Sequence, residues 1–130
     1  MSPKPRADVL VTVAALFGAI GVIAGAFGAH SLRDVLEASA TGEVWRTAVF
    51  YNLAHAVAGL AAASNRRRFG TGPAWLWLAG MFFFSGSLYI LALGGPRWLG
   101  PVTPIGGALL IAGWLWLAIG AITGKREGID

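Results

Sequence analysis

The sequence predicts an all-α integral membrane four-helix bundle, on three observations. The chain has 130 residues, of which 56% are hydrophobic and 12% are charged, whereas soluble domains carry about a quarter charged residues. Four long stretches, 9–32, 47–65, 69–96 and 98–124, contain no charged side chain. A chain this short has too much surface to hide that much apolar material in a soluble core. We therefore expect a single transmembrane domain over residues 1–130.

The first span is expected over residues 9–29. At a rise of 1.5 Å per residue, about 20 residues cross a hydrocarbon core of about 30 Å. Lys4 and Arg6 before this stretch resemble the start of a signal peptide. The apolar run is longer than a typical signal core and three more follow, so we expect it to be retained as a span.

The three later spans are expected over residues 43–64, 73–94 and 105–124. Thr41 stands where an N-cap of the second span would stand. Pro73 suits the first turn of the third span, because its missing N–H is not needed there, and Pro104 directly precedes the fourth span.

The connection between the first two spans is expected to form a short amphipathic helix over residues 31–38. Ser31, followed three residues later by Asp34, resembles a capping box, and apolar residues recur there at i, i+3 and i+4. This pattern is typical of a helix lying at the membrane surface. An ordinary loop is the alternative.

The basic residues set the orientation. Seven lysines and arginines lie on the side of the two termini and of the Arg66–Arg68 turn, and three lie on the other side. The positive-inside rule therefore places both termini in the cytoplasm, in an inner-membrane protein of several spans. The net charge of +4 is spread around the spans rather than along one stripe, so we expect no nucleic-acid partner. The absence of cysteine excludes disulfides and thiolate metal sites.

Small residues recur at helical spacing within the spans. Helices in lipid associate through such residues, because water no longer drives them together. The candidate packing positions are Gly18, Gly21, Gly25 and Gly28 in the first span, Ala54 and Ala58 in the second, and Gly106, Gly113 and Gly120 in the fourth. These positions favour a compact bundle, but they do not tell whether the faces pair within one chain or between chains.

Polar residues in the second span are the main functional candidates, because polar groups inside a bilayer are costly. Four of them recur at i+4 and form one stripe. They are Glu43, Thr47, Tyr51 and His55, with Asn52 beside them. One interpretation is a proton or ion path, or a polar ligand site, in which His55 titrates near neutral pH. The other is structural, with Tyr51 and His55 bonded to a carbonyl or to Ser85 and Ser87 of the third span.

His30, at the end of the first span, is expected to cap the last carbonyls of its helix. A metal site there would have to add acidic residues such as Asp34 and Glu37, but no H-x-x-x-H or E-x-x-H spacing is present. We therefore expect no metal and no cofactor. The sequence shows neither a G-x-S-x-G elbow nor a phosphate loop, so no catalytic residue is assigned. Trp114 and Trp116, near the middle of the fourth span, are interpreted as filling space beside glycines.

Four motifs follow one another along the chain. They are GAFGAH at 25–30, YNLAHA at 51–56, FSGSLY at 84–89, and TPIGG at 103–107 followed by Gly113-Trp114. Together they resemble the domain-of-unknown-function 423 family of small four-span bacterial inner-membrane proteins, over most of the chain from about residue 14 to 118. The resemblance implies a fold and a membrane, and no substrate or catalytic role. His30, Tyr51 and His55 coincide with its motif positions.

These observations predict a small multi-pass membrane protein with a structural or accessory role. Its expected partners are the lipid bilayer and either further copies of itself, as a homo-oligomer, or another membrane protein. The alternative is a small transporter or channel subunit with a polar path along the second span. A membrane enzyme or metal protein built on His30, His55 and carboxylates is the third and least supported possibility, and we expect no enzymatic activity.

Overall fold

The computed structural model describes residues 8–124, and within them the chain is all-helical, as the sequence predicts. No strand occurs in this part of the chain. The helices are α1 (Val9–Ala29), α2 (Arg33–Ala38), α3 (Gly42–Ser64), α4 (Arg66–Phe69), α5 (Gly72–Ala92) and α6 (Val102–Thr123), with a short 3-10 helix, η1 (Arg97–Leu99), before α6.

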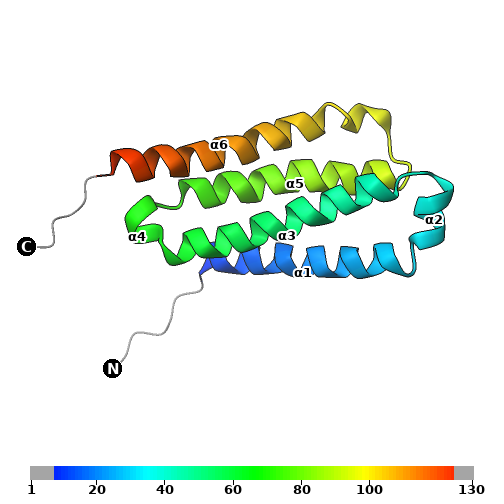
Figure 1. Ribbon diagram of the computed structural model, residues 1–130, viewed down its shortest axis with the longest axis horizontal. Coiled ribbons are helices and arrows are strands. Elements are labelled where there is room, and N and C mark those ends of the chain that lie inside the picture. The colour runs from blue at the N-terminus through cyan, green and yellow to red at the C-terminus, as the bar shows by residue number, and fades with distance from the viewer. Residues whose placement is uncertain (1–7, 125–130) are drawn as a thin grey trace, which may run out of the picture.

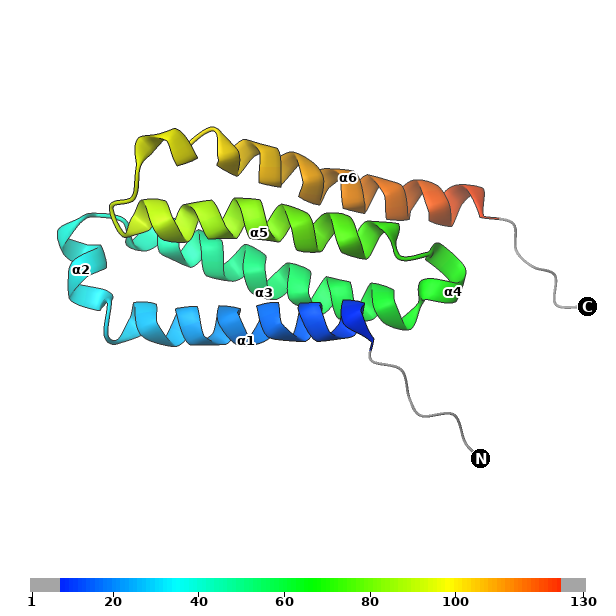
Figure 2. The same cartoon turned by 180° about the vertical axis from the view of Figure 1, so that it is seen from behind.

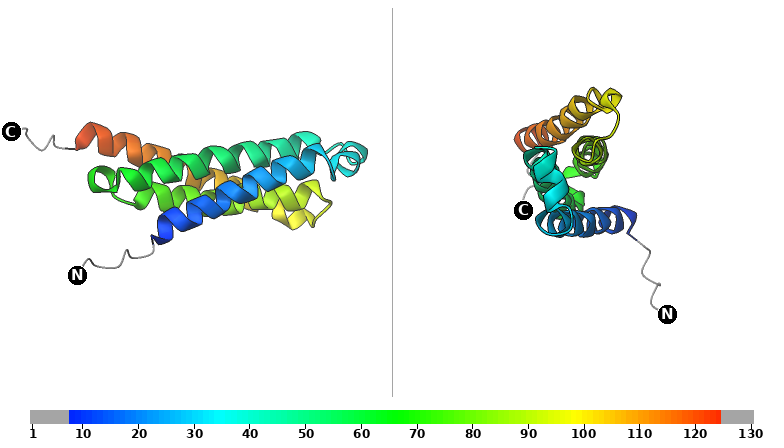
Figure 3. Two further views of the ribbon diagram at one scale, coloured as in Figure 1. Left: turned by 90° about the horizontal axis from the view of Figure 1, so that it is seen from below. Right: turned by 90° about the vertical axis from the view of Figure 1, so that its right-hand side faces the viewer.

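The four long helices form a staggered row in chain order (Figure 1). Helix α1 packs on α3, α3 on α5, and α5 on α6. Viewed along the helices, α3 and α5 lie in the middle, and α1 and α6 lie on opposite sides of them (Figure 3). Each outer helix therefore has only one extensive neighbour, and the rest of its apolar surface faces outward.

The two ends of the row differ in the connections that they carry. The start of α1, the short helix α4 and the end of α6 lie at one end, and α2 and η1 lie at the other (Figures 1 and 2). The carboxylate of Asp8 accepts a hydrogen bond from the backbone N–H of Val11 at 3.2 Å and so caps α1. It also accepts one from the Arg66 guanidinium, which ties α1 to α4.

Three helical segments are long and apolar enough to cross a membrane: Val9–Ala29, Gly72–Ala92 and Arg97–Thr123. Helix α3, the fourth expected span, has 23 residues and is not among the three. It is more polar because it carries Glu43 and Arg46 near its start and His55 further along.

The helices begin and end near the limits expected from sequence, but the starts of α6, α3 and α2 differ in detail. Helix α6 begins at Val102, so Pro104 lies inside its first turn, where a missing N–H needs no partner. Thr41 stands at the N-cap position of α3, but its hydroxyl donates to the carbonyl of Ala92 at 2.8 Å instead of capping the helix.

The capping box expected at Ser31 does not form. Helix α2 starts at Arg33, with Leu32 at the N-cap position and no side-chain cap bond. The reason is a tight turn after α1, in which the N–H of Arg33 donates to the carbonyl of His30 at 3.2 Å. Because of that turn, the N-cap position falls on Leu32 and not on Ser31.

Glycines bring neighbouring helices close in two different ways. At Gly106 an added Cβ would lie 2.3 Å from the Phe84 nitrogen and 2.8 Å from the Gly80 oxygen, so α5 and α6 meet backbone to backbone. At Gly28 it would lie 2.4 Å from Trp45 Nε1, so here α1 receives a side chain of α3. The same type of residue therefore closes both interfaces, against a different kind of neighbour.

Candidate functional site

His55 lies within α3, with only 5% of its surface exposed. The indole Nε1 of Trp114, on α6, donates to His55 Nε2 at 3.0 Å. The other ring nitrogen, Nδ1, lies 2.8 Å from the carbonyl oxygen of Tyr51, one turn earlier on the same helix. The imidazole thus joins α3 to α6 across the face of α5.

These partners fix the protonation state of the imidazole. An indole N–H can only donate, so His55 Nε2 must present a lone pair. A carbonyl oxygen can only accept, so Nδ1 carries the proton and donates to Tyr51. The ring is therefore neutral with both nitrogens occupied. A second proton could be added at Nε2 only by breaking the bond to Trp114.

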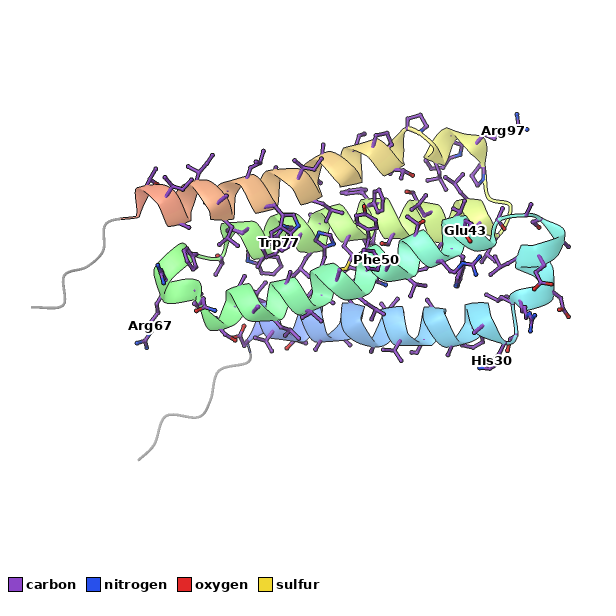
Figure 4. All side chains as sticks on the ribbon, in the orientation of Figure 1. His30, Glu43, Phe50, Arg67, Trp77 and Arg97 are labelled. Atoms are coloured by element: carbon purple, nitrogen blue, oxygen red, sulfur yellow. The ribbon has the colours of Figure 1, made fainter. Side chains whose placement is uncertain are left out.

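Several aromatic side chains pack around His55. The rings of Trp77 and Trp114 have centroids 4.4 Å apart. The ring of Tyr51 stacks on His55 at 5.9 Å with an interplanar angle of 9°, and touches Phe84 at 4.7 Å. Trp77, labelled in Figure 4, projects from α5 into this cluster. The His55 imidazole is covered by these rings, whereas Trp114 is 48% exposed, so the hydrogen bond lies at the edge of the cluster.

Asn52 forms a second polar contact between helices. It is 1% exposed, and its Nδ2 donates to the Tyr89 hydroxyl at 3.0 Å, joining α3 to α5. Its Oδ1 has no partner within the described residues, and the same is true of Trp77 Nε1. Unpaired buried polar atoms are costly, so these two atoms lie at the least satisfied points of the interior.

The rest of the expected stripe is not buried with His55. Glu43 and Thr47 are exposed, and Glu43 forms a surface ion pair with Arg46. Tyr51 is 37% exposed. The stripe therefore starts on the surface near α2 and ends at His55, the only member of the i+4 series that is buried.

Ser85 and Ser87 do not serve as partners for Tyr51 and His55, as one interpretation of the sequence held. The hydroxyl of Ser85 donates to the carbonyl of Ala48 at 2.8 Å, which joins α5 to α3. Ser87 bonds the carbonyl of Phe84 at 3.0 Å and lies 2.6 Å from the Thr103 hydroxyl on α6. Both serines connect α5 to its neighbours, but at other levels of the row.

His30 is exposed at the C-cap position of α1, and its side chain points away from the helices (Figure 4). The last carbonyls of α1 are satisfied by backbone instead, because the N–H of His30 bonds Ala26 at 3.1 Å and the N–H of Leu32 bonds Phe27 at 2.8 Å. The side-chain cap expected for His30 is thus replaced by a backbone cap. Across residues 8–124, no group of three or more His, Cys, Asp or Glu side chains is placed to hold a metal ion.

The small-residue positions divide into those that meet another helix and those that do not. Gly18, Gly21, Gly25 and Gly28 of α1 all face α3, and Gly106 and Gly113 of α6 face α5. Ala58 is half-buried. Ala54 is exposed, and an added Cβ at Gly120 would meet nothing within 4 Å. Gly120 therefore faces open space within the described residues, and Ala54 lies on the surface of α3.

Trp114 is the residue of the site whose role sequence reasoning missed. We interpreted it as filling space beside glycines, whereas its N–H bonds His55. The available signal was an indole donor near the middle of an apolar helix, where a partner is required. Trp45 is a parallel case, because its Nε1 donates to the carbonyl of Ala24 at 2.9 Å and joins α3 to α1.

The family model described as "Protein of unknown function (DUF423)" matches residues 24–107, which is more than half of the chain. The matched region includes α3, α5 and the glycine contact between α5 and α6. The chain belongs to the DUF423 family. The resemblance found in the four sequence motifs is thereby confirmed.

Relatives within this family are membrane proteins by name. A "UPF0382 membrane protein" of Staphylococcus saprophyticus is 44% identical over 86% of this chain and 95% of its own length. The "UPF0382 inner membrane protein YgdD" of Escherichia coli K12 is 39% identical over 93% of this chain and 95% of its own. Neither name states an enzymatic activity. No solved structure matches the chain.

Proposed function

We propose that this DUF423 protein is a four-span inner-membrane protein with a structural or accessory role, and that it self-associates. The name of its relative YgdD supports the inner membrane, and three apolar helices support several spans. Helix α3 is the fourth span in this proposal. Its 23 residues correspond to about 35 Å at 1.5 Å per residue, enough for a core of about 30 Å.

The polar groups of α3 are compatible with lipid because of where they lie. Glu43 and Arg46, near its start, pair with each other at the end of the row where α2 lies. His55 and Asn52 bond to α6 and α5. In this proposal α2 lies in the interface, and the end that carries α4 faces the cytoplasm together with both termini. The reason is that seven of the ten lysines and arginines of the sequence lie before α1, between α3 and α5, or after α6.

One observation carries the structural role: the imidazole of His55 is held between Trp114 and the Tyr51 carbonyl. A proton relay needs hydrogen-bond partners that can gain or lose a proton, and neither the indole N–H of Trp114 nor the backbone carbonyl of Tyr51 does so near neutral pH. In this proposal His55, the polar residue singled out in the sequence as able to titrate, serves to connect helices. For the same reason the proposal includes no catalytic step.

Self-association is proposed through the outward face of α6. A shallow groove of about 530 Å³ lies on it, lined by Ala112, Leu115, Trp116, Ile119, Gly120 and Thr123. Gly120 leaves open space there, and a tryptophan stands one turn before it. Small residues next to a bulky one allow two membrane helices to approach and interdigitate.

The self-association test measures oligomer number in liposomes, by photobleaching of single labelled chains at decreasing protein density. We expect oligomers that persist on dilution, and Gly120→Leu should shift them to monomers because it fills the open space on α6. Ala118→Leu is the matched control, since this exposed residue of α6 does not line the groove. Monomers at every density, or equal behaviour of the two variants, would refute the proposed interface.

The threading is tested with single cysteines, because the natural chain has none. Arg67→Cys, on α4, should be protected from a membrane-impermeant thiol reagent added outside intact cells. Ser39→Cys, between α2 and α3, should react. The reverse pattern would invert the orientation, and reaction of both positions would remove α3 as a span.

A small transporter or channel subunit remains the second candidate, and one observation favours it. Glu43, Thr47 and Tyr51 are exposed on one face of α3 and lead toward His55. In an oligomer this face could line a polar path. The test is proton flux into liposomes that contain the protein. The structural proposal expects flux equal to that of empty liposomes, whereas flux abolished by His55→Phe would favour transport.

A further inference from the structure

A narrow apolar groove lies near the end of the row where α4 lies, and α3, α4, α5 and α6 all line it. Its volume is about 150 Å³. Three small alanine side chains of α3 form one wall of the groove, and larger side chains of α5 and α6 form the opposite wall. These residues are Ala58, Ala61 and Ala62, with Trp77, Trp114 and Leu117 opposite.

The dimensions of the groove select its occupant. From Ala58 to Asn65, which also lines it, the distance along α3 is about 10 Å at 1.5 Å per residue. A helix with its side chains is about 10–12 Å across, so a groove of about 150 Å³ holds part of one slender apolar chain at most. A further helix therefore does not fit.

One end of the groove is basic. Phe69 of α4 lines the groove, and the guanidinium carbon of Arg68 lies 4.9 Å from the centroid of its ring. The two neighbouring arginines are placed differently. Arg66 bonds Asp8 and the carbonyl of Ala63, and Arg67 points away from the helices (Figure 4). The ion pairs formed within residues 8–124 do not include Arg68.

We propose that this groove binds one acyl chain of an anionic phospholipid, whose phosphate is held by Arg68. The inference rests on the proposed function, because α3 and α6 must lie in the bilayer for a lipid to reach the groove. The order of chemistry along the groove matches a lipid, with aromatic and aliphatic surface inside and a cation at the opening. Arginine binds phosphate oxygens through two parallel N–H donors, so Arg68 suits the headgroup.

The test is native mass spectrometry of the purified full chain with two phospholipids that have identical acyl chains. Phosphatidylglycerol is anionic and phosphatidylcholine is zwitterionic. We expect one phosphatidylglycerol per chain to be retained about tenfold more tightly, as one charge-assisted contact would give. Equal retention of both lipids would overturn the proposal, and this comparison requires no variant to fold.

Matched variants separate the headgroup from the acyl chain. Arg68→Gln should remove about tenfold of the phosphatidylglycerol preference, whereas Arg67→Gln, with the same change of charge, should keep it within about twofold. Ala61→Leu fills the groove and should weaken binding of both lipids, whereas Ala54→Leu, at an exposed site of α3 outside the groove, should not. The proposal fails if either pair of variants behaves alike.

The same spectra report oligomer number, so the two ideas can fail separately. Monomers that retain phosphatidylglycerol in a manner sensitive to Arg68→Gln would refute self-association and support the lipid site. Oligomers without preference for the anionic lipid would do the opposite. Whether α3 spans the membrane is tested separately, by the cysteine labelling at positions 67 and 39.

Discussion

The α1–α3 and α5–α6 interfaces both close on glycines, but Gly106 meets backbone where Gly21 and Gly28 meet side chains. At α5–α6, Gly106 lies against the backbone of Gly80 and Phe84. At α1–α3, Gly21 and Gly28 receive the side chains of Leu53 and Trp45. A side chain can change its rotamer to make room, whereas a helix backbone moves only with its whole helix. The same residue type thus predicts different tolerance in the two regions.

The largest effect is expected at Gly106, where backbone meets backbone. Gly106→Ala places a Cβ 2.3 Å from the Phe84 nitrogen, so the helices must separate, and we expect a loss of about 3 kcal/mol in the free energy of unfolding. Unfolding in mixed micelles titrated with a denaturing detergent, followed by circular dichroism, measures it. Gly107→Ala is the control, because its Cβ would meet Phe84 Cδ2 at an ordinary 3.6 Å. Equal midpoints would show that α5–α6 adapts after all.

A graded series is expected where glycines of α1 meet side chains of α3. Gly28→Ala meets the hydrogen-bonded ring of Trp45 and should cost about 2 kcal/mol, and Gly21→Ala meets the flexible end of Leu53 and should cost about 1 kcal/mol. Gly18→Ala faces Ala56 Cβ at 3.8 Å and should be neutral or stabilising, since alanine favours a helix over glycine. The same unfolding titration ranks the three variants, and any other order contradicts the comparison.

Each side of the row also has one tryptophan hydrogen bond, and these two should differ. Trp114→Phe leaves the buried Nε2 of His55 without a donor, so we expect a loss of about 1–2 kcal/mol. Trp45→Phe removes a donor from the Ala24 carbonyl, which already accepts a helical N–H, so about 0.5–1 kcal/mol is expected. Trp98→Phe serves as the control, because this tryptophan is 70% exposed and no hydrogen bond of its indole N–H occurs among the described contacts. A larger loss of unfolding free energy for Trp45→Phe than for Trp114→Phe would show that the Trp45 hydrogen bond is the stronger of the two.

The smallest effect is expected where Asp8 ties α1 to α4. The hydrogen bond from Arg66, followed by that from the Val11 N–H, lowers the pKa of the Asp8 carboxyl from 3.8. The folded pKa is therefore below the unfolded one, so this stabilisation is complete above pH 3.8 and is lost as the pH falls through the folded value. Asp8→Asn should flatten the acid limb of the stability profile, and Arg66→Gln should flatten it as well. An unchanged profile in both variants would exclude Asp8 as its source.

The helix limits were within reach of sequence because they depend on local patterns. Charge-free stretches and flanking polar residues marked α1, α5 and α6 to within a few residues. The detailed caps were not, because the Thr41 hydroxyl has a competing partner that only the fold supplies, and a tight turn after α1 separates Ser31 from the start of α2. The hydroxyl of Thr41 reaches Ala92, 51 residues further along the chain, and no local pattern encodes that contact.

The sequence predicts which polar residues form the candidate site, but not which residues they bond. His55 and Asn52 stood out as polar groups in an apolar stretch, and both are buried. Their partners depend on which helices lie side by side, and glycine stripes do not specify that. Hence Ser85 and Ser87 were reasonable candidates for His55, while the actual donor, Trp114, lies 59 residues away on α6.

The staggered row has a consequence for how the protein is made. Each long helix packs on the next one to leave the ribosome, so the α1–α3 contact can close before α5 is synthesised, and α3–α5 before α6. His55 is the exception, because its donor arrives with the last helix. A truncated or stalled chain that lacks α6 would leave the His55 imidazole without its donor, and this defect would mark it as an unfinished molecule.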